Sequence, residues 1–351
     1  MLSFISNSNS VLFSLAFAAA FLSTMILGKL MIPALRAWQR RGQPIRTDGV
    51  KMHIAEKSGT PTMGGLIFIP AILGSSILFM DIFNIIPWIP LIAMATFGFV
   101  GFLDDSDKLR RGNAYGGLSQ WGRLISEGIL ATLLAFVIDS TMPAGVPDLS
   151  QAVLLPTGMV LSLGIFYFVW SYFVIVGTAN ATNISDGLDG MLPKMYLCVM
   201  AVMVVALVGV TRIGFMPNLP YLPETAALFP VFGAVMGAVL GYLWFNAKPA
   251  YVMMGDIGSL ALGGLLGSSA LLMKAEIIMA VAATMMVIVL LSSFIQMMYY
   301  KFVAPRGKPP FLMAPLHHHL ELKGWAETKI VERFFIISII FAGAAVALLK
   351  L

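Results

Sequence analysis

Six aspartates stand at the ends of long apolar stretches, where a charged side chain lies close to hydrocarbon. They are Asp104, Asp105, Asp107, Asp186, Asp189 and Asp256. Ionisable residues in such positions are costly and by default indicate function. One alone, such as Asp256, could instead cap a helix N-terminus, where capping and the helix dipole favour a carboxylate. Capping does not explain the whole set, which favours a shared ligand.

The residue types around these aspartates favour a divalent cation and phosphate. Adjacent carboxylates repel one another unless a metal ion or a lysine lies between them. Oxygen ligands in a chain whose single cysteine is Cys198 favour magnesium or manganese over zinc. Glycine-rich segments 187–190 and 255–258 open expected helices, where backbone N–H groups suit phosphate. Lys57 and Lys108 add positive charge, so the pattern predicts a metal-bridged pyrophosphate site and phosphoryl-type transfer.

Three consecutive histidines, His317, His318 and His319, form a second polar group. Consecutive side chains point in different directions on a helix or a strand, so we do not expect a zinc site from this run alone. Phosphate binding or proton exchange near neutral pH fits the run better.

The elements that position these residues are membrane helices. Apolar residues make up 59% of the 351 residues and charged residues 11%, against roughly 45–50% and 25% in soluble domains. Uncharged stretches of about 20 residues, enough to cross a bilayer, recur along the whole chain. We therefore expect an all-α polytopic protein with a single integral membrane domain over residues 1–351. The ten candidate spans are Val11–Pro33, Thr62–Met80, Ile86–Leu103, Trp121–Ser140, Thr157–Thr178, Met191–Thr211, Ala226–Asn246, Gly255–Met273, Glu276–Tyr300 and Ile330–Lys350.

The basic residues predict the orientation of these spans. The connections on one side of the membrane contain 18 of the 22 Lys and Arg residues. The connections on the opposite side contain Arg212, Lys274 and Lys350. The basic side is cytoplasmic by the positive-inside rule, which places both termini outside and the aspartates and histidines inside. Glycines at 233, 237 and 241 further predict a close helix contact along the seventh span.

Six motifs on the cytoplasmic side carry a family resemblance. They are GTPTMGG at Gly59–Gly65, GFLDDSDK at Gly101–Lys108, NISDGLDG at Asn183–Gly190, WFNAKPA at Trp244–Ala250, MGDIGSLALGG at Met254–Gly264 and APLHHHLELKGW at Ala314–Trp325. In this order they resemble the polyprenyl-phosphate N-acetylhexosamine-1-phosphate transferase superfamily. The histidine motif with Glu321 resembles its bacterial phospho-N-acetylmuramoyl-pentapeptide transferase branch.

The resemblance implies a reaction of cell-wall (peptidoglycan) synthesis in the bacterial inner membrane. Undecaprenyl phosphate would attack UDP-N-acetylmuramoyl-pentapeptide, giving lipid I and UMP, with Mg²⁺ required. It also implies a homodimer in the bilayer, ten helices with a broken ninth, and no nucleic-acid partner. The prolines Pro305, Pro309 and Pro310 would supply the break, because proline kinks helices.

The resemblance also implies roles for individual residues. Asp256 would be the metal ligand, and Asp104 and Asp105 would act near the lipid phosphate with Lys108. The residues around the uridine diphosphate would be Lys57, Asn183, Asp186, Asp189 and Gln296, and Asn246 would also bind substrate. His317 and His319 would bind the substrate's phosphate or sugar, and His318 would be catalytic. Three positions depart from the family pattern, namely Met253, Val289 and Leu312.

Two alternatives remain open from the sequence. The donor could be UDP-N-acetylglucosamine, with the same chemistry. A secondary transporter is a different class, since intramembrane acids and broken helices also mark ion pathways. Transporter sites lie near the bilayer midplane, however, whereas these aspartates stand at span ends on one side.

Overall fold

The computed structural model describes residues 2–39, 57, 59–113, 116–142, 149–212, 220–303 and 309–349, with side chains from residue 9 onward. These residues form twelve α-helices, a short 3-10 helix and a two-stranded sheet. The helices are α1 (Leu2–Gln39), α3 (Gly65–Phe79), α4 (Trp88–Arg111), α5 (Gln120–Thr141), α6 (Phe166–Ser185), α7 (Met191–Thr211), η2 (Pro223–Leu228), α8 (Phe229–Asn246), α9 (Gly255–Leu272), α10 (Glu276–Ala282), α11 (Thr284–Phe302), α12 (Leu316–Leu322) and α13 (Glu327–Leu348). The predicted all-α class is confirmed, apart from the small sheet.

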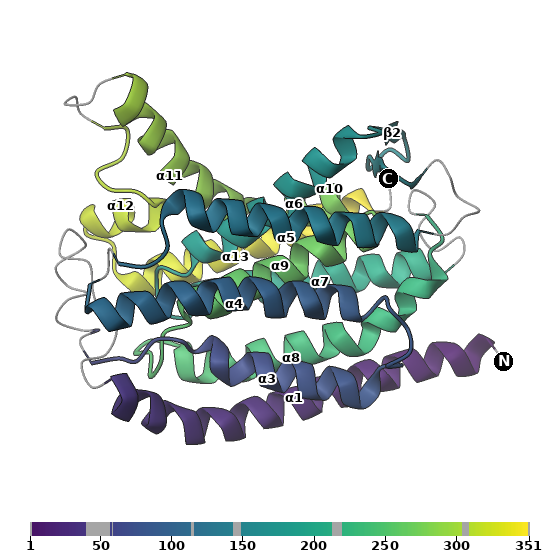
Figure 1. Cartoon of the computed structure of the whole chain (residues 1–351), viewed down its shortest axis with the longest axis horizontal. Coiled ribbons are helices and arrows are strands. Elements are labelled where there is room, and N and C mark those ends of the chain that lie inside the picture. The colour runs from purple at the N-terminus through teal and green to yellow at the C-terminus, as the bar shows by residue number, and fades with distance from the viewer. Residues whose placement is uncertain are drawn as a thin grey trace.

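Eight helical segments of the described chain are long and apolar enough to cross a membrane, so the protein is polytopic. They contain α1, α4, α5, α7, α8, α9, α11 and α13. Helix α3 is apolar but has 15 residues. The N-terminal end of α1 and the C-terminal end of α13 lie at one end of the bundle, and α12 lies at the other (Figure 1).

The predicted fifth span was wrong at its start. Residues Ala152–Leu154 form strand β1, which pairs antiparallel with β2 (Val160–Ser162). Helix α6 begins only at Phe166. The connecting turn contains Pro156, and Gly158 has φ +78°. Proline lacks the backbone N–H that a helix interior needs, and a residue with positive φ does not fit a helix. The apolar stretch alone therefore predicted a helix start that lies too early in the chain.

The predicted ninth span is divided in two, but the prolines do not divide it. The break falls at Ala283 (φ −84°, ψ 7°), between α10 and α11. Pro309 and Pro310 follow α11, and Pro305 lies outside the described residues. Alanine is the strongest helix former, so no local signal marks this position. Helix α10 packs against α7 and α13, whereas α11 contacts α6 and then leaves the bundle (Figure 1).

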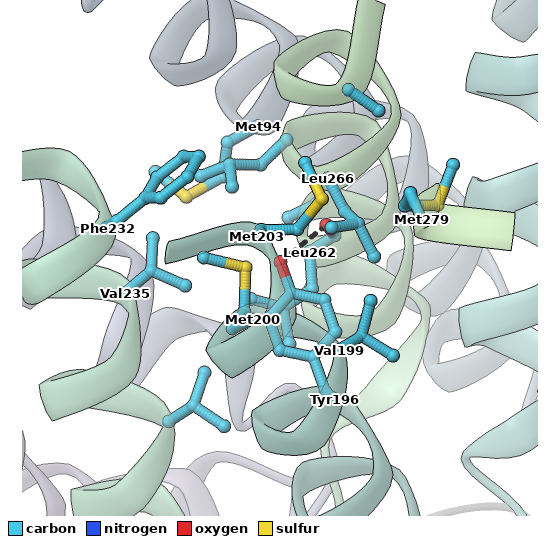
Figure 2. Packing of buried hydrophobic residues seen from close by; sticks show 14 of the residues in the cluster. Met94, Tyr196, Val199, Met200, Met203, Phe232, Val235, Leu262, Leu266 and Met279 are labelled. Carbon is cyan, nitrogen blue, oxygen red and sulfur yellow. Dashed lines mark hydrogen bonds between the residues drawn. The ribbon is translucent and has the colours of Figure 1, made fainter. Parts of the chain in front are cut away.

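Helix α9 lies at the centre of the bundle. Every residue of it from Ile257 to Leu272 is buried, as expected of a helix that is apolar on all sides. Figure 2 shows its Leu262 and Leu266 among methionines and aromatic residues of α4, α7 and α8. The hydroxyl of Tyr196 donates to the carbonyl of Leu262 at 2.9 Å. This packing holds the N-terminus of α9, and with it Asp256, in a fixed place.

The glycine contact predicted for the seventh span is confirmed. A Cβ atom at Gly233 or Gly237 of α8 would lie 2.2 or 2.1 Å from the carbonyl oxygen of Phe13 or Phe17 in α1. Only glycine allows the two backbones to approach this closely.

Candidate active site

Three aspartates meet where the C-terminal part of α4 crosses the start of α9. Asp104 and Asp105 are buried in α4, and Asp256 occupies the first turn of α9. Gly101 makes the crossing possible, since a Cβ atom there would lie 2.3 Å from the carbonyl oxygen of Asp256. One carboxylate oxygen from each aspartate lies within 4.8 Å of the others. We call Asp104, Asp105, Asp256 and Lys108 the acidic centre.

Lys108 lies between two of these carboxylates. Its Nζ is 2.5 Å from Oδ2 of Asp104 and 2.8 Å from Oδ2 of Asp256. The amide of Asn183 donates to the other oxygen of Asp256 at 2.7 Å. The predicted juxtaposition of adjacent carboxylates with a cation is therefore present, and the cation is a lysine.

The two aspartates of α4 have different partners. Oδ1 of Asp104 accepts from the backbone N–H of Leu118 at 2.8 Å, so both of its oxygens are engaged. Oδ2 of Asp105 accepts from the backbone N–H of Ile257 at 3.2 Å, which ties α4 to the start of α9. Asp107 is not part of this group and pairs with Arg111 at 2.9 Å.

The donor set of the acidic centre fits a hard divalent cation. Three carboxylates converge without a sulfur or imidazole ligand among them. Magnesium takes oxygen ligands, commonly one or two carboxylates together with substrate phosphates. Asp104, Asp105 and Asp256 could hold such an ion.

A second charged group links four parts of the chain. Lys57 lies 2.8 Å from Asp189 and 3.2 Å from Glu327, and Lys248 lies 2.5 Å from the other oxygen of Glu327. We call these four residues the Lys57 cluster. Desolvation lowers the pKa of Lys57, but the carboxylates of Asp189 and Glu327 outweigh it and raise that pKa above its ordinary value. Lys57 therefore stays charged throughout the neutral range.

Asn246 and Asp186 lie near the Lys57 cluster. Oδ1 of Asn246 accepts from the backbone N–H of Gly190 at 3.0 Å, next to Asp189. Burial raises the pKa of Asp186 well above its usual range; Lys57 opposes this shift, and Asp256 and Asp105 add to it. Asp186 thus experiences the charges of both groups.

The segment 59–65 supports the loop that leads into Asp256. The backbone N–H of Met253 donates to Pro61 at 2.8 Å, and that of Gly64 donates to Met253 at 2.9 Å. Gly255 adopts φ +74°, and a Cβ atom there would lie 2.5 Å from Oδ2 of Asp105. Glycine is therefore required immediately before Asp256.

The three histidines lie on α12 and point in different directions, as predicted. Buried His317 covers Gly187, where a Cβ atom would lie 2.1 Å from its Nε2. Nδ1 of His318 is 2.7 Å from Glu321. Nδ1 of His319 accepts from the backbone N–H of Leu312 at 3.0 Å. Of the three histidines, His317 is therefore the one that packs against the glycine-rich segment 187–190.

Gln296 has a structural contact in addition to its predicted role. Its Oε1 accepts from the backbone N–H of Phe311 at 3.2 Å. Four residues earlier, the hydroxyl of Ser292 accepts from the N–H of Leu316 at 2.9 Å. These bonds hold the segment before the histidines against α11.

Sequence reasoning missed several site residues. Glu327 is 2% exposed and anchors the Lys57 cluster, yet in sequence it is an ordinary acidic residue at a helix start. Arg123, Glu127 and Asn180 form a network beside Asp256. Arg123 and Glu127 could have been identified from the sequence, because a basic and an acidic residue stand four positions apart within an apolar stretch.

Family models match the parts of the chain that hold this candidate site. The profile of glycosyl transferase family 4 matches residues 87–274. A motif described as phospho-N-acetylmuramoyl-pentapeptide-transferase signature 1 matches residues 57–69. The first match contains all three aspartates of the acidic centre, and the second begins at Lys57.

Several relatives are similar over almost the whole chain, and each is named phospho-N-acetylmuramoyl-pentapeptide-transferase. The protein of Rickettsia massiliae (strain Mtu5) is 40% identical over 334 residues, covering 93% of this chain and 90% of that protein. The protein of Caulobacter sp. (strain K31) is 38% identical over 338 residues, covering 95% and 90%. That of Caulobacter vibrioides is 37% identical over 343 residues, covering 96% and 92%. The chain therefore belongs to the phospho-N-acetylmuramoyl-pentapeptide-transferase family, within glycosyl transferase family 4.

Proposed function

We propose that this enzyme transfers phospho-N-acetylmuramoyl-pentapeptide from its UDP-linked donor to undecaprenyl phosphate, forming lipid I and UMP. The observation that carries the proposal is the convergence of Asp104, Asp105 and Asp256 around Lys108 in a chain of this family. The reaction belongs to peptidoglycan synthesis.

Magnesium is the ion that we propose for the acidic centre, with Asp256 as its protein ligand. When bound, Mg²⁺ would neutralise charge on the pyrophosphate of the donor. Lys108 already contacts Asp104 and Asp256, and it would hold the phosphate of the lipid acceptor. Positioning and electrostatics dominate phosphoryl transfer, so fixed charges are the main requirement.

We assign the nucleotide part of the donor to the Lys57 cluster and its surroundings. The residues proposed to contact it are Lys57, Asn183, Asp186, Asp189, Asn246 and Gln296. Support comes from Lys57, whose raised pKa keeps it charged, and from Asp189, which pairs with Lys57 at 2.8 Å. His317 and His319 would contact phosphate or sugar, and His318 would exchange a proton, as its pairing with Glu321 favours.

A groove on the outer surface of α5 suits the polyprenyl chain. It has a volume of about 520 Å³, and Trp121, Leu124, Gly128 and Leu133 are among its lining residues, together with Tyr172 of α6. These side chains are mainly apolar and face the membrane.

We propose ten membrane crossings, made by the eight long apolar segments together with α3 and α6. Both termini would lie outside, in keeping with their shared position at one end of the bundle (Figure 1). The site would then face the cytoplasm, where nucleotide sugars are made, in the bacterial inner membrane. We also propose a homodimer, as the family resemblance implies.

The test is lipid product formation by the purified protein in detergent. The protein is given undecaprenyl phosphate and either radiolabelled UDP-N-acetylmuramoyl-pentapeptide or radiolabelled UDP-N-acetylglucosamine, with Mg²⁺ or with a chelator. We expect labelled lipid from the first donor only, and only with Mg²⁺. Equal or better use of the second donor would overturn the donor assignment, and metal-independent turnover would overturn the role of Mg²⁺.

A further inference from the structure

A partly buried polar network lies beside the acidic centre and has no role in the mechanism above. It consists of Arg123 and Glu127 on α5 and Asn180 on α6. Glu127 is fully buried although it belongs to a helix that is long and apolar enough to cross the membrane. A carboxylate in this position is costly unless it is paired and has a function.

The network holds the guanidinium of Arg123 at two of its three nitrogens. Nε lies 3.4 Å from Oε1 of Glu127, and Nη2 donates to Oδ1 of Asn180 at 2.9 Å. The amide of Asn180 in turn donates to Oε2 of Glu127 at 2.7 Å. Glu127 therefore holds Arg123 both directly and through Asn180.

The third nitrogen of Arg123 is directed at the acidic centre. Nη1 lies 3.7 Å from Oδ2 of Asp256, the same oxygen that Lys108 contacts at 2.8 Å. A separation of 3.7 Å is an ion pair but too long for a hydrogen bond, and the side chain of Arg123 is 21% exposed. This nitrogen is therefore able to donate to an incoming anion, and the arginine fork suits phosphate oxygens.

The neighbour that Arg123 shares with Lys108 indicates which phosphate it meets. Both cations face Oδ2 of Asp256, and Lys108 is the residue assigned above to the phosphate of the lipid acceptor. The apolar groove lies on the other side of α5, because Trp121 and Leu124 line it while Arg123 projects toward α6 and α9. We propose that Glu127 and Asn180 are positioning residues that hold Arg123 to bind the phosphate of the lipid acceptor. This inference rests on the proposed function, because it names the residues that orient the acceptor in that same site.

The experiment compares Glu127→Gln in two backgrounds, wild type and Arg123→Lys. Glutamine keeps the size of the side chain and an acceptor for Asn180 but removes the charge facing Arg123. Because the effects of substitutions at contacting residues are not additive, the effect of Glu127→Gln on KM should depend on whether Arg123 is present. We expect Glu127→Gln to raise KM for undecaprenyl phosphate about tenfold in the wild type, with KM for the donor unchanged. In the Arg123→Lys background the same change should have less than a twofold effect.

Asn180→Ala and Ser126→Ala complete the set. Asn180→Ala should also raise KM for the lipid acceptor selectively. Ser126 neighbours Glu127, but among the described residues its hydroxyl bonds only to its own helix, at the carbonyl of Gly122, so its variant should keep wild-type kinetics. A second readout, independent of turnover, is the rise in melting temperature of the detergent-solubilised protein on adding undecaprenyl phosphate, which Glu127→Gln should reduce.

The possible outcomes separate the two proposals. A purely structural Glu127 would lower the melting temperature without ligand and leave both KM values of the folded enzyme unchanged. That result, or equal losses in the two backgrounds, would overturn the positioning role. If wild-type protein forms no lipid product, the proposed function fails instead. If Glu127→Gln does not fold, Asn180→Ala decides, and an unchanged acceptor KM in that variant would overturn the inference.

Discussion

At the scale of single residues, the contacts of Asp104 bear on whether it acts as a general base. Both of its oxygens are engaged, one by Lys108 and the other by the backbone N–H of Leu118. A phosphate monoester has a second pKa near 6, so most of the acceptor is already doubly charged at neutral pH. A base would add little, and we expect Asp104 to act by holding Lys108 in place.

The pH profile of Asp104→Asn tests this assignment. We expect its rate to stay low between pH 7 and 9, because hydroxide cannot replace a missing carboxylate contact to Lys108. Initial rates of lipid formation, measured in buffers across this range and normalised to wild type, provide the check. Strong recovery of the variant toward pH 9 would instead favour a proton-abstracting role.

Asp256 is the second single residue to test, because it pairs with Lys108 and one of its oxygens lies within 4.8 Å of those of Asp104 and Asp105. Asp256→Asn keeps the size of the side chain but removes the charge that Lys108 and a metal ion require. We expect kcat to fall by about three orders of magnitude, as when a main charge-stabilising group is lost. The melting temperature should change little. Asp107→Asn is the matched control, since Asp107 pairs with Arg111 outside the centre; comparable losses in both variants would contradict the assignment.

At the scale of elements, the close crossing of α4 and α9 brings the aspartates together. Gly101→Ala places a Cβ atom 2.3 Å from the carbonyl oxygen of Asp256, so one helix has to move. Overpacking of this kind costs about 1–3 kcal/mol. We expect a lower melting temperature and a loss of activity greater than the loss of stability explains.

The control for this prediction is Gly74→Ala in α3. A Cβ atom at Gly74 would meet no other atom within 4 Å, and alanine favours a helix over glycine. Thermal unfolding and lipid formation should therefore match or exceed wild type. If both glycine variants behave alike, the helix crossing does not limit the site.

At the scale of the whole molecule, the uneven distribution of basic residues predicts which end of the bundle faces the cytoplasm. The test uses cysteine variants in a Cys198→Ser background, labelled in intact cells with an impermeant thiol reagent. Cysteines replacing Thr157 and Tyr221, both exposed, should react from outside. Those replacing Asn113 and Lys323, also exposed, should react only after lysis. The reverse pattern would place the acidic centre on the wrong side for a nucleotide sugar.

The sequence by itself determined the all-α polytopic class, and it predicts the sidedness and most of the candidate site. An apolar stretch long enough to cross a bilayer is a local property of the chain, and its backbone must satisfy its own hydrogen bonds, so helices follow directly. The fifth and ninth spans show where this reasoning ends. Pro156 and Gly158 turn an apolar stretch into a hairpin, and packing against α7 and α13 divides a helix at Ala283.

Only the tertiary structure decided which charges meet. Lys108 and Asp256 are far apart in the chain and lie 2.8 Å apart in space, because Gly101 lets α4 approach α9. The same holds for Glu327, which joins Lys57 and Lys248 from another helix. The partners of a buried charge depend on side-chain directions across packed helices, which no local pattern encodes, whereas the cost of burying that charge in an apolar stretch is visible in the sequence.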